Sequence, residues 1–254
     1  MGETVNILNC QFNAWDTRKT LTNIEDMISS DKKGYLCTVN VAILMMMRSN
    51  SRLADFIHRA AMIVADGQPL IWTSRYMKQP LPERVTGVEL VDDLAKMAEK
   101  NQWGVYLLGA TSEIVSSVAE RLQQNNPKLI ISGFSDGYFD AKGAKMRAQE
   151  IRESGAKLLI VAMGVPRQEY FLEEQWKQLG VNFAVGVGGS FDVIAGVTKR
   201  APAWMQKFGL EWLYRTLQEP RRLAWRYLTT NTHFIYLFFK EIVFGLKRKK
   251  EYTK

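Results

Sequence analysis

Short apolar runs alternate with amphipathic segments along most of this chain, and this alternation constrains the fold more than any single motif does. Strands are expected at residues 4–9, 34–40, 62–65, 103–109, 129–134, 157–163 and 182–187. Helical patterns lie between them, at residues 17–29, 41–48, 51–60, 70–77, 86–100, 109–124 and 144–154. Alternating strands and helices favour parallel strand pairing, because each helix carries the chain back across the sheet. The sequence therefore predicts an α/β fold: a Rossmann-like, mostly parallel sheet with helices on both faces.

Small or polar residues follow five of the expected strands, where each strand ends. They are Thr38 and Asn40, Asp66, Gly109 and Thr111, Gln168, and Gly188, Gly189 and Asp192. The carboxyl ends of parallel strands meet at one edge of the sheet, which is the usual ligand edge of such folds. We therefore expect these residues to line a common site.

Asp66 lies in the turn of a strand–turn–helix pattern that runs from Met62 to Trp72. One interpretation makes its carboxylate a catalytic base at the end of the strand. The other makes it a turn residue or helix N-cap ahead of Pro69. The same two interpretations, ligand contact or helix cap, apply to Thr38 and Asn40. Local sequence leaves both open.

Two further segments carry weaker indications of an anion site. Arg84 suits a phosphate contact, although a surface arginine is the commoner case. The run from Gly109 to Thr111 joins a strand to a helix start, where free N–H groups attract anions. It matches neither a Walker loop nor the glycine fingerprint of dinucleotide binders. The missing fingerprint weakens the hypothesis that the protein is a Rossmann oxidoreductase.

Several other chemistries lack a motif in this sequence. It contains no Asp-x-Asp, no histidine pair with metal spacing and no Gly-x-Ser-x-Gly elbow. Its two cysteines, Cys10 and Cys37, lie in strand-like runs, so we expect buried, reduced thiols in a cytosolic protein. Because these metal-binding motifs are missing, no metal site is expected, and no cofactor is expected either.

The basic charge is concentrated at the C-terminus. Residues 199–254 hold 13 Lys and Arg against 4 Asp and Glu, a net charge of +9, whereas residues 1–198 hold 21 and 22. We expect a catalytic domain over residues 1–197 and a basic, aromatic-rich, helical appendage over residues 198–254. The apolar stretch 234–246 is too short to span a bilayer but suits a helix at an anionic membrane surface. The alternatives are a helix packed on the domain and a nucleic-acid-binding tail.

Motifs along nearly the whole chain resemble the WecG/TagA/CpsF family of bacterial glycosyltransferases. The matching runs are Thr38-Val39-Asn40, Ala65-Asp66-Gly67, Glu83-Arg84-Val85-Thr86-Gly87, Leu108-Gly109-Ala110-Thr111, Gly137-Tyr138-Phe139, Pro166-Arg167-Gln168-Glu169, Gly186 to Asp192, Lys199-Arg200-Ala201-Pro202, Gly209 to Arg215, and Gln218 to Arg222.

The resemblance implies an inverting, metal-independent transferase that moves a sugar, typically N-acetylmannosamine, from a UDP-sugar to a polyprenyl-diphosphate-linked sugar. Such enzymes build teichoic acid linkage units, common antigen or exopolysaccharide. It also implies Asp66 as the general base, with Thr38 and Asn40 beside it.

The same resemblance implies further contacts and a location. Gln168 and Asp192 would face the nucleotide-sugar, and the tail arginines Arg215, Arg221 and Arg222 the diphosphates. A lipid-linked acceptor implies a cytoplasmic enzyme held peripherally at the inner face of the cell membrane, with no nucleic-acid partner. The sequence leaves the oligomeric state open, a homo-oligomer included.

Overall fold

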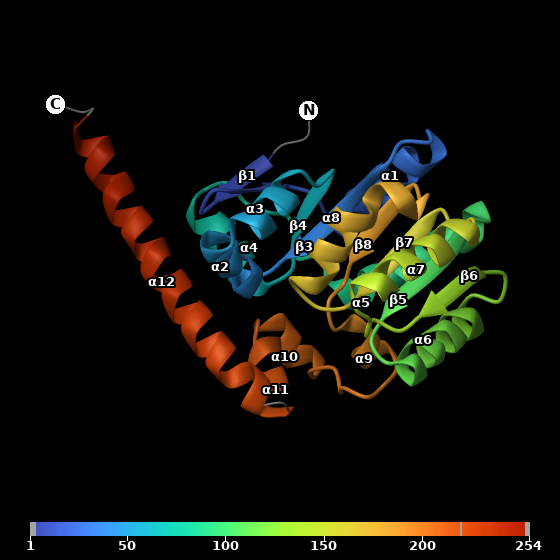
Figure 1. The fold of residues 1–254 in the computed structure, drawn as a ribbon. Helices are drawn as coiled ribbons and strands as arrows, with labels where there is room; N and C mark the ends of the chain where they lie inside the picture. Colours follow the sequence, from blue (N-terminus) through green and yellow to red (C-terminus); the bar gives the residue numbers. More distant parts are fainter. Residues whose placement is uncertain (1–3, 219, 252–254) are drawn as a thin grey trace.

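A six-stranded parallel sheet forms the centre of the molecule (Figure 1). The computed structural model describes residues 4–218 and 220–251, without the side chains of residues 203, 207, 221–223, 226, 227 and 241–251. The sheet consists of β3 (Gly34–Val39), β4 (Met62–Ala65), β5 (Gly104–Gly109), β6 (Ile130–Ser135), β7 (Leu158–Ala162) and β8 (Phe183–Gly186). Their order across the sheet is β4-β3-β8-β7-β5-β6, and each neighbouring pair is parallel. The predicted α/β class is confirmed.

Helices cover both faces of this sheet. One face carries α1 (Thr17–Ser29), α5 (Gly87–Asn101), α6 (Ser112–Asn125) and α9 (Ser190–Ile194); the other carries α2 (Val41–Ser49), α3 (Ser51–His58), α7 (Ala141–Glu153) and α8 (Arg167–Leu179). Successive side chains of a strand point to opposite faces, so in β7 Leu158 and Ile160 join one core while Leu159 and Val161 join the other. Burial on both faces explains why β4 and β7 are continuously apolar, whereas the edge strand β6 has no buried residue and contains two serines and a glycine.

The N-terminal segment differs from the expected single strand at residues 4–9. It forms a hairpin of β1 (Thr4–Ile7) and β2 (Cys10–Asn13), a two-stranded antiparallel sheet separate from the main one. The turn residues Leu8 and Asn9 have φ angles of 50° and 68°. A hairpin turn of two residues with positive φ usually contains glycine, and the absence of one at this turn hid the hairpin from sequence-based prediction.

Both cysteines are buried free thiols, as predicted. Burial raises the pKa of Cys10 to about 12, and it also raises the pKa of Cys37 well above the ordinary value. Both side chains are therefore neutral thiols that pack as small apolar groups.

After α9, the described chain continues with three helices: α10 (Ala203–Lys207), α11 (Glu211–Gln218) and α12 (Pro220–Glu251). The expected helix at residues 234–246 is part of α12, which is 32 residues long and has no glycine or proline in residues 221–244. α12 runs from α11 past α2 (Figure 1), and Phe234 on its inner face is only 5% exposed. Within the part of the chain that the structure describes, no helix is both long and apolar enough to span a membrane.

Gly109 at the end of β5 provides a test of the sheet packing. Its φ is 139°, and a Cβ there would lie 2.3 Å from the carbonyl oxygen of Ala162 in β7. Backbone atoms cannot move aside cheaply, so we expect Gly109→Ala to lower the free energy of unfolding by about 2–4 kcal/mol in urea denaturation.

Gly155→Ala is the matched control. Gly155 also has a positive φ, 65°, but no atom lies within 4 Å of the added Cβ. Gly155→Ala should therefore lower the free energy of unfolding by only about 1–2 kcal/mol. Equal losses in the two variants would contradict a steric role for the contact between β5 and β7.

Candidate functional site

A cavity of about 450 Å³ opens at the carboxyl edge of the sheet. Ten of the predicted site residues line it: Thr38, Asn40, Asp66, Arg84, Thr111, Gln168, Gly188, Gly189, Asp192 and Arg215. Gly109 does not, because it is buried below the turn whose next residues, Ala110 and Thr111, reach the cavity. Arg221 and Arg222 belong to the first turn of α12, but their side chains lie outside the described part of the structure.

Several helices begin at this cavity, and polar side chains cap three of them. Asn40 accepts a hydrogen bond from Ile43 N at the start of α2 (3.0 Å), and Thr111 one from Ile114 N at the start of α6 (3.4 Å). Thr86 caps α5, where its side chain accepts a hydrogen bond from Glu89 N. Asn40 and Thr111 are thus helix caps that also line the cavity. The positive ends of these helix dipoles favour an anionic ligand.

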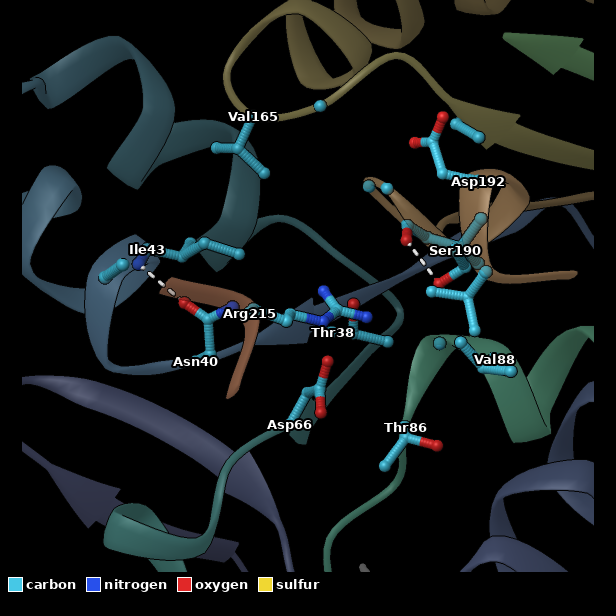
Figure 2. A pocket seen from close by; sticks show the side chains of 18 of the residues that line it. Thr38, Asn40, Ile43, Asp66, Thr86, Val88, Val165, Ser190, Asp192 and Arg215 are labelled. Atoms are coloured by element: carbon cyan, nitrogen blue, oxygen red, sulfur yellow. Dashed lines mark hydrogen bonds between the residues drawn. The ribbon is translucent and has the colours of Figure 1, made fainter. Parts of the chain in front are cut away.

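Asp66 lies at the end of β4, and its backbone N–H donates to the carbonyl oxygen of Val39 in β3 (2.9 Å). The next helix, α4 (Gln68–Tyr76), begins at Gly67 without a side-chain cap, so the capping interpretation of Asp66 is not supported. Its carboxylate points into the cavity, toward Thr38 and Arg215 (Figure 2). Burial and then the charge of Glu211 raise the pKa of Asp66 to about 6, against the effect of nearby arginines. A carboxylate with this pKa is ionised at neutral pH and accepts a proton readily.

Glu211 of α11 bridges two cavity arginines. Its Oε2 accepts a hydrogen bond from Nη1 of Arg84 (2.8 Å), and its Oε1 lies 3.9 Å from Nη2 of Arg215. Arg84 also donates to Oε1 of Gln206 in α10 (3.4 Å). The loop before α5 is thereby tied to α10 and α11, and two guanidinium groups are held beside Asp66.

A second ion pair lies on the adjacent wall. Arg200 donates from Nη2 to Glu89, whose other carboxylate oxygen accepts from the Thr86 hydroxyl (2.8 Å). The Nε of Arg200 is buried without a hydrogen-bond partner in the structure. Arg200 thus adds a further cationic group to the cavity lining, which also includes Arg84, Arg167 and Arg215.

Gln168 ties two turns together beneath the cavity. It is 3% exposed, and its Oε1 accepts from Gly188 N (3.0 Å) while its Nε2 donates to Oε1 of Glu169 (2.8 Å). Burial raises the pKa of Glu169 to about 7. The amide group of Gln168 therefore fixes the turn after β8, which carries Gly188 and Gly189 into the cavity wall.

The sequence did not single out several residues that line the cavity. They include Arg167, Arg200, Glu211, Trp212 and Asn231. Four of them fall within or beside the quoted motifs, but nothing in the motifs distinguished these side chains from their neighbours. Asn231 lies in the middle of α12 and had no sequence signal.

Comparisons with known proteins identify the family of this chain. Residues 5–248 match the model of the family described as Glycosyl transferase WecG/TagA/CpsF family. The chain belongs to this family. A protein of Staphylococcus aureus (strain MW2), named N-acetylglucosaminyldiphosphoundecaprenol N-acetyl-beta-D-mannosaminyltransferase, is 32% identical over 222 residues, which is 87% of each chain. A protein of the same name from Bacillus spizizenii (strain ATCC 23059 / NRRL B-14472 / W23) is 33% identical over 199 residues, 78% of this chain and 76% of its own.

Membership confirms the resemblance seen in the sequence. The protein is a glycosyltransferase, so the cavity at the carboxyl edge is the candidate active site. This assignment favours the enzyme hypothesis over the nucleic-acid-binding and oxidoreductase alternatives. The roles of individual residues remain predictions.

The raised pKa of Asp66 predicts an effect on stability. Keeping the buried carboxylate ionised in the folded state is unfavourable, because its pKa is about 6 there and about 3.9 in an unfolded chain. Above pH 6 the folded protein bears this cost; as pH falls from 6 to 4, the folded state binds a proton before the unfolded state does and the cost disappears. We expect Asp66→Asn to raise the melting temperature at pH 7.5 but not at pH 4.

Thermal unfolding of both proteins at the two pH values measures this effect. Asp55→Asn, at an exposed position of α3, is the control and should change little at either pH. A stability difference for Asp66→Asn that does not depend on pH would contradict the burial of an ionised carboxylate.

Proposed function

We propose that the enzyme transfers N-acetylmannosamine or a related sugar from a UDP-sugar to a polyprenyl-diphosphate-linked sugar, with inversion at the anomeric carbon. The names of the relatives support the transferred sugar and the polyprenyl-diphosphate-linked acceptor. The observation that carries the mechanism is Asp66, a carboxylate at a strand end that points into the cavity (Figure 2) and whose pKa is raised to about 6. The product would serve the assembly of a bacterial cell-wall or surface polysaccharide, such as teichoic acid.

The proposed step is a single displacement. The acceptor hydroxyl oxygen attacks the anomeric carbon of the donor sugar, and its proton passes to the Asp66 carboxylate. The bond between that carbon and the β-phosphate oxygen breaks, and UDP leaves with the bonding electron pair. Thr38 and Asn40, which line the cavity beside Asp66, would position the reacting sugars.

The departing UDP needs compensation for its developing negative charge. The sequence has no Asp-x-Asp motif, so we assign this role to cavity arginines and helix N-termini rather than to a metal ion. Arg84 and Arg215 are held in the cavity by Glu211, and the helices α2, α5 and α6 begin at its rim. Gln168, Gly188, Gly189 and Asp192 also line the cavity, and we place the nucleotide beside them.

Asp66→Asn tests the base. We expect kcat to fall by about 10² to 10⁴, because the acceptor hydroxyl loses its proton acceptor, while affinity for UDP stays close to that of the wild type. Product formation is followed by mass spectrometry, with a UDP-sugar panel and a short-chain polyprenyl-diphosphate sugar as substrates. Unchanged turnover would remove Asp66 from this role.

The pH profile provides an independent control on the assignment. In the wild type, kcat/KM should fall as pH drops below about 6, because protonated Asp66 cannot accept a proton. After burial, the Glu211 charge is the next largest cause of the raised pKa of Asp66. In Glu211→Gln the acidic limb should therefore move to lower pH. If the acidic limb of the pH profile does not move in this variant, the limb reports a titratable group other than Asp66.

We propose further that residues 198–254 form the appendage that holds the enzyme on the cytoplasmic face of the membrane, where its lipid-linked acceptor resides. The outer face of α12 carries a stripe of exposed apolar side chains, Leu228, Ile235 and Phe239, at helical spacing. The residues Lys247 to Lys250 add four positive charges near its end. An apolar stripe next to a basic cluster suits an anionic lipid surface.

Sedimentation with vesicles of phosphatidylglycerol and phosphatidylcholine tests this attachment. The triple variant Leu228→Ser, Ile235→Ser and Phe239→Ser should bind roughly tenfold or more weakly, because it removes apolar area that would enter the lipid. A double variant of exposed apolar residues elsewhere, Ile130→Ser with Met146→Ser, should bind like the wild type. Equal binding by all three proteins would rule out the α12 stripe as the anchor.

A further inference from the structure

An apolar track leaves the active-site cavity along α4. Gln68, Trp72 and Tyr76 are spaced four residues apart and therefore lie on one face of this helix. Gln68 lines the cavity, whereas Trp72 and Tyr76 are 49% and 62% exposed. The face thus changes from a polar cavity wall to exposed aromatic rings over about 12 Å of helix.

α12 and the turn that follows α10 border the same track. A Cβ on Gly209 would lie 2.6 Å from Cβ of Gln68 and 3.1 Å from Cη2 of Trp72, so this backbone lies directly beside α4. Asn231 of α12 lines the cavity, and seven residues later, on the same side of that helix, Phe238 meets Tyr76. The rings of Tyr76 and Phe238 form an edge contact with centroids 5.5 Å apart. Both helices therefore lead from the cavity to a shared aromatic end.

We propose that this track between α4 and α12 binds the first isoprene units of the acceptor lipid, an inference that rests on the proposed function. The acceptor is an amphiphile whose charged diphosphate joins a sugar to a hydrocarbon chain. The site has the same order: Asp66 and the arginines lie in the cavity, and Trp72, Tyr76 and Phe238 follow outside it. Phe238 is partly buried, whereas Trp72 and Tyr76 are exposed, and a hydrocarbon chain that covers their rings removes apolar surface from water.

The track has a role distinct from the outer stripe of α12. The stripe would face lipid acyl chains in the membrane, whereas the track begins at the cavity and fixes the direction in which the acceptor enters. A chain bound there places the diphosphate beside the cavity arginines. The contribution of the track to acceptor binding should therefore be measurable with a soluble acceptor in the absence of a membrane.

The test compares two soluble acceptors that differ only in the lipid: N-acetylglucosaminyl diphosphate carrying a farnesyl or a methyl group. The wild type should show a KM about tenfold lower or more for the farnesyl acceptor. Trp72→Ala and Tyr76→Ser should each raise the KM for the farnesyl acceptor about fivefold to tenfold. The KM for the methyl acceptor, the KM for the UDP-sugar and kcat should stay unchanged.

Phe134→Ala is the control, because it removes an exposed aromatic ring from β6 at the far edge of the sheet. A wild type that does not distinguish the two acceptors would overturn the proposal, and so would variants that raise both acceptor KM values equally. Transfer to neither acceptor would instead contradict the proposed function. As a readout independent of turnover, a photoreactive farnesyl diphosphate should label peptides 68–77 or 230–240, and labelling confined to other peptides would also overturn the track.

Discussion

The ion pair between Arg84 and Glu211 joins the two parts of the chain that enclose the cavity. Arg84 belongs to the loop that follows α4, and Glu211 begins α11, 127 residues later. Because both partners are largely buried, removing one would leave an uncompensated charge, which costs far more than losing an exposed pair. The same carboxylate holds Arg215 and raises the pKa of Asp66. The side chain of Glu211 thus joins the two walls of the cavity, holds its arginines in place and affects the proton affinity of Asp66.

The sequence was sufficient to predict the α/β fold and the edge at which the site lies. Continuous apolar strands separated by amphipathic helices determine a parallel sheet, and that topology brings the strand ends together whatever the loops contain. The strand pattern alone therefore places Asp66, Thr38 and Gln168 near one another. It does not predict their hydrogen bonds, because the partners of Gln168, which are Gly188 and Glu169, are identified only by three-dimensional proximity.

Other features depend on tertiary contacts that have no periodic signature. Glu211 resembles any acidic residue in the first turn of a helix, and only its position between two arginines gives it a role. Asn231 lines the cavity because α12 packs on α2, and the sequence of α12 does not reveal that contact. The apolar stretch 234–246 indicated a helix correctly, but a helix can bury one apolar face and expose another, as Phe234 and Ile235 do.

The small hairpin at the N-terminus has a consequence for how the protein behaves in concentrated solution. β4 is the last strand on its side of the sheet, and the side chain of Asn13 in β2 accepts a hydrogen bond from the outward N–H of Ile63 (2.8 Å). An uncovered strand edge is a template on which a strand of another molecule can pair. The hairpin covers this edge of β4, and the side chain of Asn13 takes the place of a neighbouring strand at Ile63 N. The hairpin therefore leaves less of the edge of β4, the strand that ends just before Asp66, open to pairing with another molecule.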